Sequence, residues 1–178
     1  MNLRILGIDP GSRVTGYGLI EIEGVRSRHL THGCIRCDGG DLSDRLLRIH
    51  TELSRVIAAH GPGEVAIESV FVNRNVASAL VLGQARGAAI LAVAGNGLSL
   101  SEYAPAQVKS AVVGHGRAEK AQIQHMVCVL LKLEQAPPAD AADALAVAIC
   151  HAHLRGRLPA RRKSALRAAA AEYRSWTP

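Results

Sequence analysis

Apolar residues in the first part of the chain fall into short runs that end at glycine or proline. Leu3 to Asp9 is such a run and ends at Pro10-Gly11, which predicts a buried strand. A second run, Val14 to Glu23, is rich in β-branched and aromatic residues, and a third, residues 29–37, follows the break at Gly24. Together the three runs predict an antiparallel meander.

The rest of the chain alternates between helical and strand patterns. Between residues 41 and 60 apolar side chains recur at helical spacing, and the glycines and proline at 61–63 end the pattern. The next predicted elements are a strand, a helix, a strand and three helices, at residues 64–70, 76–95, 98–103, 105–113, 118–133 and 137–154. This order predicts a mixed sheet with helices on its faces.

Residues 76–95 differ from the other predicted helices because they are apolar nearly all round. Such a helix is expected to be buried on most sides, as a central core helix or as a subunit interface, and the sequence leaves both open. Gln84 and Arg86 make it a poor membrane span. The first ten residues are too short for a signal peptide and contain Asp9, so we expect a soluble, cytoplasmic protein.

The chain of 178 residues suits one folded domain, which we place at residues 1–154. In that part 14 Lys and Arg balance 14 Asp and Glu. Residues 155–178 carry seven basic residues and one acid, so the whole net charge of +6 (7 − 1) lies in a basic tail. Such a tail indicates a polyanionic partner, although a solvated tail that aids solubility explains the charge equally well.

Four acidic residues lie in apolar surroundings, where an unpaired carboxylate is unfavourable. Asp9 and Glu68 each end an apolar strand, and Asp140 and Asp143 belong to an otherwise apolar helix. The i,i+3 spacing points the two helical acids the same way, and adjacent strand ends could bring the other two to them. Four oxygen donors without His or Cys suit Mg²⁺ or Mn²⁺, and two such ions can promote phosphodiester hydrolysis.

Each acid also has an ordinary explanation when it is taken alone. Asp140 could charge or cap a helix N-terminus, and Asp9 before Pro-Gly could be a turn residue. Glu68 could pair with an arginine. Asp143 is hardest to explain this way because it lies past the first turn. Taken together, the four acids favour a metal site.

Other chemical motifs are incomplete. The G-x-x-x-x-G of residues 11–16 lacks the following Lys-Ser/Thr of a phosphate-binding loop. Cys34 and Cys37 have no second pair at metal spacing, so we expect free thiols. His151 and His153 are two residues apart on a predicted helix, which splays them, and we expect a surface position for them.

At this point the sequence resembles a known family, the RuvC Holliday junction resolvases. The resemblance rests on GIDPGSRVTGYG at residues 7–18 and runs in order from about residue 3 to 153. Its other parts include GCIR at 33–36, AIE at 66–68, LGQARG at 82–87, QVK at 107–109, AEK at 118–120 and DAADALA at 140–146. Twelve successive opening residues and the DAAD block make the match specific.

The resemblance implies an α/β, ribonuclease H-like fold with a five-stranded mixed sheet flanked by helices. It implies a Mg²⁺-dependent homodimer, with two ions per subunit and Mn²⁺ as an alternative, that nicks two opposed strands of a four-way DNA junction symmetrically. The metal-binding acids of the family fall on Asp9, Glu68, Asp140 and Asp143. The expected protein partners are the branch-migration proteins RuvA and RuvB.

The resemblance also suggests DNA contacts. Phe71 would stack on an unpaired base, although without the resemblance a lone Phe is more often a core residue. Lys109 and Lys120 would position the scissile phosphate, unless they are ordinary surface lysines. Arg74 could hold a phosphate. Arg86, inside the apolar helix, is the weaker candidate because an acid could pair with it there.

The chain departs from the family at Val76-Ala77 and Val81, where an acid and a lysine are usual, and its tail matches no family motif. Two other functions are alternatives to a junction resolvase. A sugar-kinase or actin-like ATPase shares an early Asp before a glycine-rich hairpin, but it needs a second domain. A DNA-binding module without catalysis would not require four intact acids.

Overall fold

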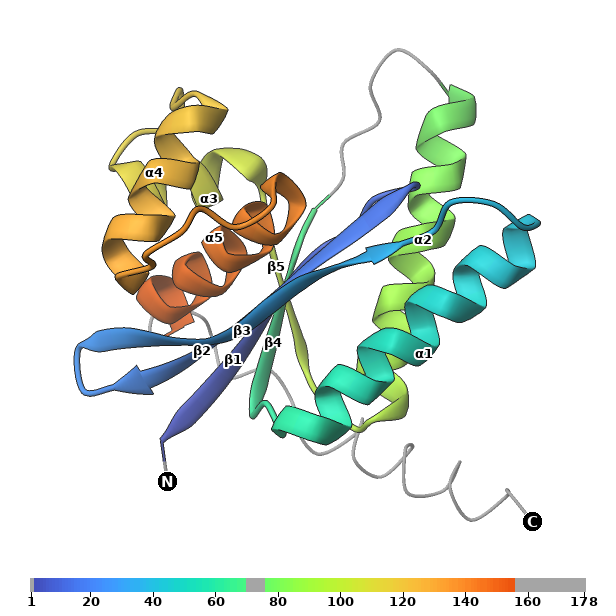
Figure 1. The fold of residues 1–178 in the computed structure, drawn as a ribbon, viewed down its shortest axis with the longest axis horizontal. Helices are drawn as coiled ribbons and strands as arrows, with labels where there is room; N and C mark the ends of the chain where they lie inside the picture. Colours follow the sequence, from blue (N-terminus) through green and yellow to red (C-terminus); the bar gives the residue numbers. More distant parts are fainter. Residues whose placement is uncertain (1, 70–75, 156–178) are drawn as a thin grey trace.

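The computed structural model describes residues 2–69 and 76–155, and Figure 1 shows their arrangement. Phe71, Arg74 and nearly all of the predicted tail lie outside the described residues. The elements in chain order are β1 (Leu3–Asp9), β2 (Val14–Glu23), β3 (Arg26–Arg36), α1 (Leu42–His60), β4 (Glu64–Glu68), α2 (Val76–Gly95), β5 (Leu100–Tyr103), α3 (Pro105–Val113), α4 (Lys120–Leu131) and α5 (Ala139–Leu154).

The strands form one mixed sheet in the order β3-β2-β1-β4-β5. The predicted meander is confirmed, because β1, β2 and β3 pair antiparallel. β4 pairs parallel with β1, and β5 pairs parallel with β4. Consequently β1, β4 and β5 end at the same edge of the sheet.

Helices cover both faces of the sheet, and each face has its own core (Figure 1). On one face α3, α4 and α5 pack against Ile5, Ile20 and Ala66. On the other, α1 and α2 pack against Leu6, Ile8 and other strand residues. Because successive strand residues face opposite sides, Leu6 and Ile8 point to α1 and α2 while their neighbours point to α5.

Helix ends follow local chemistry. The Asp41 side chain caps α1 by accepting a hydrogen bond from the backbone N–H of Asp44 (3.0 Å). Gly61 ends the helix in the left-handed conformation, with φ of 55°. The α1, α2 and α3 predictions are close to the observed bounds, whereas β5 and α4 are shorter than predicted.

The expectation that residues 76–95 are buried on most sides is wrong for the single chain. Only five α2 residues are buried, namely Ala85, Ala88, Ala89, Ala92 and Val93. Leu80 and Leu91 are each 64% exposed. The central core helix is instead α5, in which ten of sixteen residues are buried. Within the described residues α2 alone has the length and hydropathy of a membrane span, a test that core helices of soluble proteins also pass.

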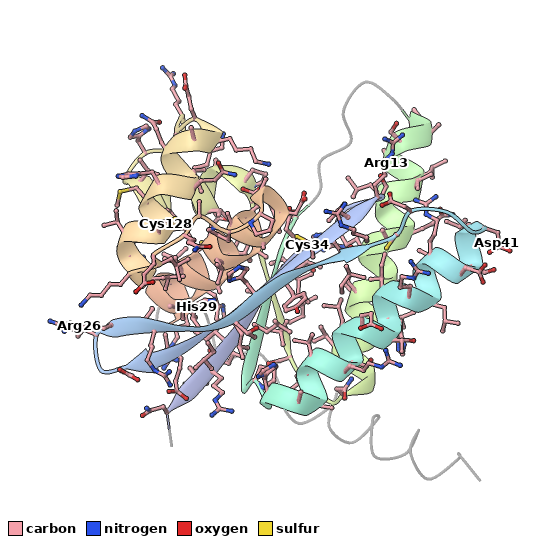
Figure 2. The ribbon with its side chains drawn as sticks, viewed as in Figure 1. Arg13, Arg26, His29, Cys34, Asp41 and Cys128 are labelled. Carbon is pink, nitrogen blue, oxygen red and sulfur yellow. The ribbon has the colours of Figure 1, made fainter. Side chains whose placement is uncertain are left out.

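Two further predictions concern cysteine and histidine. None of the four cysteines, Cys34, Cys37, Cys128 and Cys150, forms a disulfide among the described residues; Figure 2 shows Cys34 on β3 and Cys128 on α4. The surface position expected for His151 is wrong. His153 is exposed, but His151 is 4% exposed, because it lies on the side of α5 that faces the sheet.

Candidate metal centre

Asp9 and Glu68 lie at the ends of neighbouring parallel strands. Ile8 on β1 is in register with Ile67 on β4, so the acid that follows each of them lies at the same edge of the sheet. The alternation of strand side chains gives both acids the same face as Ile5 and Ala66, which pack against α5. Strand register and alternation therefore place both carboxyl groups beneath that helix.

Two glycines let α5 approach these strands closely. A Cβ atom at Gly7 would overlap the backbone of Ala144 on α5, and one at Gly16 would overlap the backbone of Asp140. Gly16 is itself paired with Asp9 across β1 and β2. The missing side chains thus bring the start of α5 directly over the strand end that carries Asp9.

Asp140 and Asp143 lie near the N-terminus of α5, three residues apart. The N-cap residue, Pro138, makes no side-chain capping bond. Asp140 lies in the first turn, where the helix dipole favours a negative charge. The capping explanation for Asp140 therefore fails, although the dipole explanation stands.

The electrostatics link Asp9 to each of the other three carboxylates, and link Glu68 to Asp143. The pKa of Asp9 is raised from 3.8 to about 8, first by burial and then by the charges of Glu68, Asp143 and Asp140, against a smaller lowering by Lys120. The pKa of Glu68 is also raised, first by burial and then by Asp143, while Lys109 and Lys120 lower it. The site holds more negative charge than its neighbours balance.

Two lysines border the acids. The Lys120 Nζ atom lies 2.7 Å from the Asp143 carboxylate, in an ion pair whose lysine side chain is 59% exposed. Lys109 and Lys120 line one hollow of about 200 Å³ together with Glu68 and Asp143. Pro105 and Lys120, the first residues of α3 and α4, belong to its lining.

The donor chemistry suits a hard divalent cation, because the four groups offer carboxylate oxygens alone. Within residues 2–69 and 76–155 no three acidic, His or Cys side chains are already arranged as a cage around one ion. Two features explain why the carboxylates are not gathered around one point. The neighbouring acids repel a charged Asp9, and Asp143 is paired with Lys120. A cation would offset both the burial and the repulsion that raise the pKa of Asp9.

The structure brings together six of the predicted site residues, the four acids and the two lysines. The predicted pairing of Arg86 with an acid is confirmed, since its guanidinium lies 2.5 Å from Glu102 on β5. That Gly7 and Gly16 allow the close approach of α5 was not predicted from the sequence. A signal for it is present, because Gly7 is two residues from Asp9 on one strand and Gly16 is two residues from Gly18 on the next. Glycines at this spacing leave one face of the sheet without side chains.

Comparisons with known proteins agree with this geometry. The family model described as crossover junction endodeoxyribonuclease RuvC matches residues 5–151. The protein of that name from Alkalilimnicola ehrlichii is 54% identical over 150 residues, which cover 84% of this chain and 91% of that protein.

Solved structures agree as well. The Thermus thermophilus RuvC structure has a TM-score of 0.80 at 34% identity and covers 87% of this chain and 96% of its own. The same protein in complex with a Holliday junction substrate has a TM-score of 0.79 at 35% identity, covering 84% and 93%. The ribonuclease H-like fold implied by the sequence is thereby confirmed.

Proposed function

This chain belongs to the RuvC family of crossover junction endodeoxyribonucleases, and from that premise we propose that it resolves Holliday junctions with Asp9, Glu68, Asp140 and Asp143 as its catalytic metal ligands. The observation that carries the assignment is the effect of Glu68, Asp143 and Asp140 on the pKa of Asp9, which couples acids from β1, β4 and α5. Among the described residues only Asp143 of the four acids forms an ion pair, with Lys120.

The four carboxylates would hold two Mg²⁺ ions per subunit, with Mn²⁺ as an alternative. When bound, such ions lower the pKa of a water molecule and stabilise the leaving oxygen of a phosphodiester. Asp9, which keeps its proton to about pH 8 in the metal-free protein, would have to release that proton to become a ligand.

The chain's own cations would place the substrate. Lys120 now pairs with Asp143, and Lys109, which lines the same hollow, lowers the pKa of Glu68. If Asp143 becomes a metal ligand, Lys120 is free to contact the scissile phosphate, so the two lysines would position it and offset its charge. Phe71 and Arg74 are proposed as further DNA contacts from the sequence alone.

We also propose a homodimer, because two symmetric nicks require two copies of one site related by a two-fold axis. The exposed apolar side of α2, with Leu80 and Leu91, suits that contact. RuvA and RuvB remain the expected protein partners, and the cytoplasm the expected location.

The test uses synthetic four-way junctions and linear duplexes of matched sequence, with and without Mg²⁺. We expect paired, symmetric nicks in the junction only, and only with the metal. Asp143→Asn should abolish cutting while junction binding, measured by gel shift without metal, stays intact. Cleavage retained by Asp143→Asn would contradict the site assignment, and equal cutting of the linear duplex would contradict the substrate.

A further inference from the structure

A buried chain of hydrogen bonds joins three elements at the end of α5 that is far from the acids. The Tyr103 hydroxyl lies 2.7 Å from Nδ1 of His151, and Nε2 of His151 lies 2.9 Å from the Glu64 carboxylate. Tyr103 is 2% exposed and His151 is 4% exposed. The chain thus links the end of β5, the last turns of α5 and the start of β4.

The direction of each hydrogen bond follows from the chemistry of the groups. Burial lowers the pKa of His151, and Glu64 opposes this shift only in part. A neutral imidazole has one N–H, and a carboxylate can only accept, so Nε2–H donates to Glu64 and Nδ1 accepts from Tyr103. Burial raises the pKa of Tyr103 to about 12, so its hydroxyl keeps the proton that it donates.

Two of the elements joined here, β4 and α5, carry three of the four acids, namely Glu68, Asp140 and Asp143. Glu64 and Glu68 are four residues apart on β4, which is about 13 Å of strand. His151 and Asp143 are eight residues apart on α5, which is about 12 Å of helix. Because the two lengths nearly match and the elements run in opposite directions, fixing His151 against Glu64 sets Asp143 opposite Glu68.

Tyr103 also contacts the opposite end of β4, where Glu68 lies. It is in register with Glu68, and its carbonyl accepts a hydrogen bond from the backbone N–H of Ser69 (2.8 Å). One residue therefore holds the strand beside Glu68 through its backbone and holds α5 through its hydroxyl.

We infer that Tyr103, His151 and Glu64 are positioning residues that fix the axial position of α5 on the sheet and so the spacing between Asp143 and Glu68. The inference rests on the proposed function, because it takes these two acids to share metal ions. A metal site depends on ligand placement to within about 0.5 Å, so a small shift of α5 weakens metal binding before it unfolds the protein.

The test measures two values. The first is the dissociation constant of Mn²⁺ for the metal-free full chain, determined by calorimetry without DNA. The second is the Mg²⁺ concentration for half-maximal junction cleavage. We expect Tyr103→Phe and Glu64→Ala to raise both values about 3- to 10-fold, less than the 10- to 100-fold typical when a direct partner of a ligand is lost. Glu64→Gln should stay near the unmodified protein, because its amide oxygen still accepts from His151.

Ile57→Val is the matched control, since Ile57 is an α1 residue buried in the core on the other face of the sheet from α5. It should lower thermal stability while leaving both metal values unchanged. If Tyr103→Phe and Glu64→Ala behave like Ile57→Val, or if Glu64→Gln is as impaired as Glu64→Ala, the inference is wrong. If the unmodified protein neither binds Mn²⁺ nor cuts junctions, the proposed function fails instead.

Discussion

Asp9 is surrounded by like charges in a largely buried position, and this governs how the residue responds to pH. Its neighbours at the site are Glu68, Asp143 and Asp140, with Lys120 as the opposing charge. A carboxyl in such a place keeps its proton until a cation compensates the others. The chemistry of the site is therefore a competition between protons and metal ions for the same oxygens.

From this follows a pH dependence of the metal-free protein. The Asp9 carboxyl has a pKa of about 8 in the folded chain and an ordinary value of 3.8, so the folded form binds more protons between these limits. Stability should therefore fall as pH rises through that window, by up to about 1.4 kcal/mol per pH unit for this one group. Chemical denaturation at pH 6 and pH 8.5 in a chelator measures the fall.

Asp9→Asn is the control for that measurement, because its amide does not titrate and should leave a visibly flatter stability curve. Saturating Mg²⁺ should also flatten the curve of the unmodified chain. If Asp9→Asn and the unmodified chain show the same pH dependence of stability without metal, Asp9 is not held protonated.

Where the local context was enough, the sequence pointed to acids that the structure brings near one another, and their role as metal ligands stays a proposal. Asp143 stood out because its neighbours on the helix are apolar, and Asp9 and Glu68 because each ends an apolar strand. Sequence reasoning failed at His151, whose hydrogen-bond partners are 48 and 87 residues away along the chain. No local pattern contains those contacts.

Among the elements, α5 determines the geometry of the site, since it carries two acids and crosses the strands that carry the others. Its close approach depends on glycines, and the acid spacing depends on where it rests. The strands and helices were predicted from their periodicity. That α5 and not α2 is the central core helix was not predicted. Both helices are apolar nearly all round, so only packing decides which one enters the core.

The close approach predicts the effect of a single methyl group at Gly7. Gly7→Ala would place its Cβ against the Ala144 carbonyl and the Ala148 backbone, so α5 must move away. We expect a loss of about 1–3 kcal/mol in the free energy of unfolding and loss of cleavage. Gly95→Ala is the matched control, because its Cβ would meet no atom within 4 Å and should raise stability by up to about 1 kcal/mol. Unchanged stability in Gly7→Ala would contradict the packing.

For the whole molecule, the exposed apolar side of α2 supports the proposed homodimer. Leu80 and Leu91 are each 64% exposed on a helix whose mean composition suits a core. An enzyme that cuts two opposed strands needs two sites, and a second copy of this chain satisfies both requirements.

Introducing a charge on α2 tests the dimer. Leu91→Lys should shift the protein toward monomer in sedimentation analysis, because a lysine would be buried without a partner. It should also replace paired nicks by slower, single ones. Leu47→Lys on α1 is the matched control, because Leu47 is equally exposed at 64% and should leave the assembly unchanged. A dimer that survives Leu91→Lys but not Leu47→Lys would place the interface on α1.

We propose that carboxylates from β1, β4 and α5 jointly bind the metal ions. Anomalous diffraction from crystals grown with Mn²⁺ measures this directly, because it locates the ions independently of any activity. We predict manganese peaks between Asp9, Glu68, Asp140 and Asp143, with Lys120 turned away from Asp143. Manganese bound elsewhere, or a site that stays empty at saturating Mn²⁺ with Lys120 still paired to Asp143, would contradict the account.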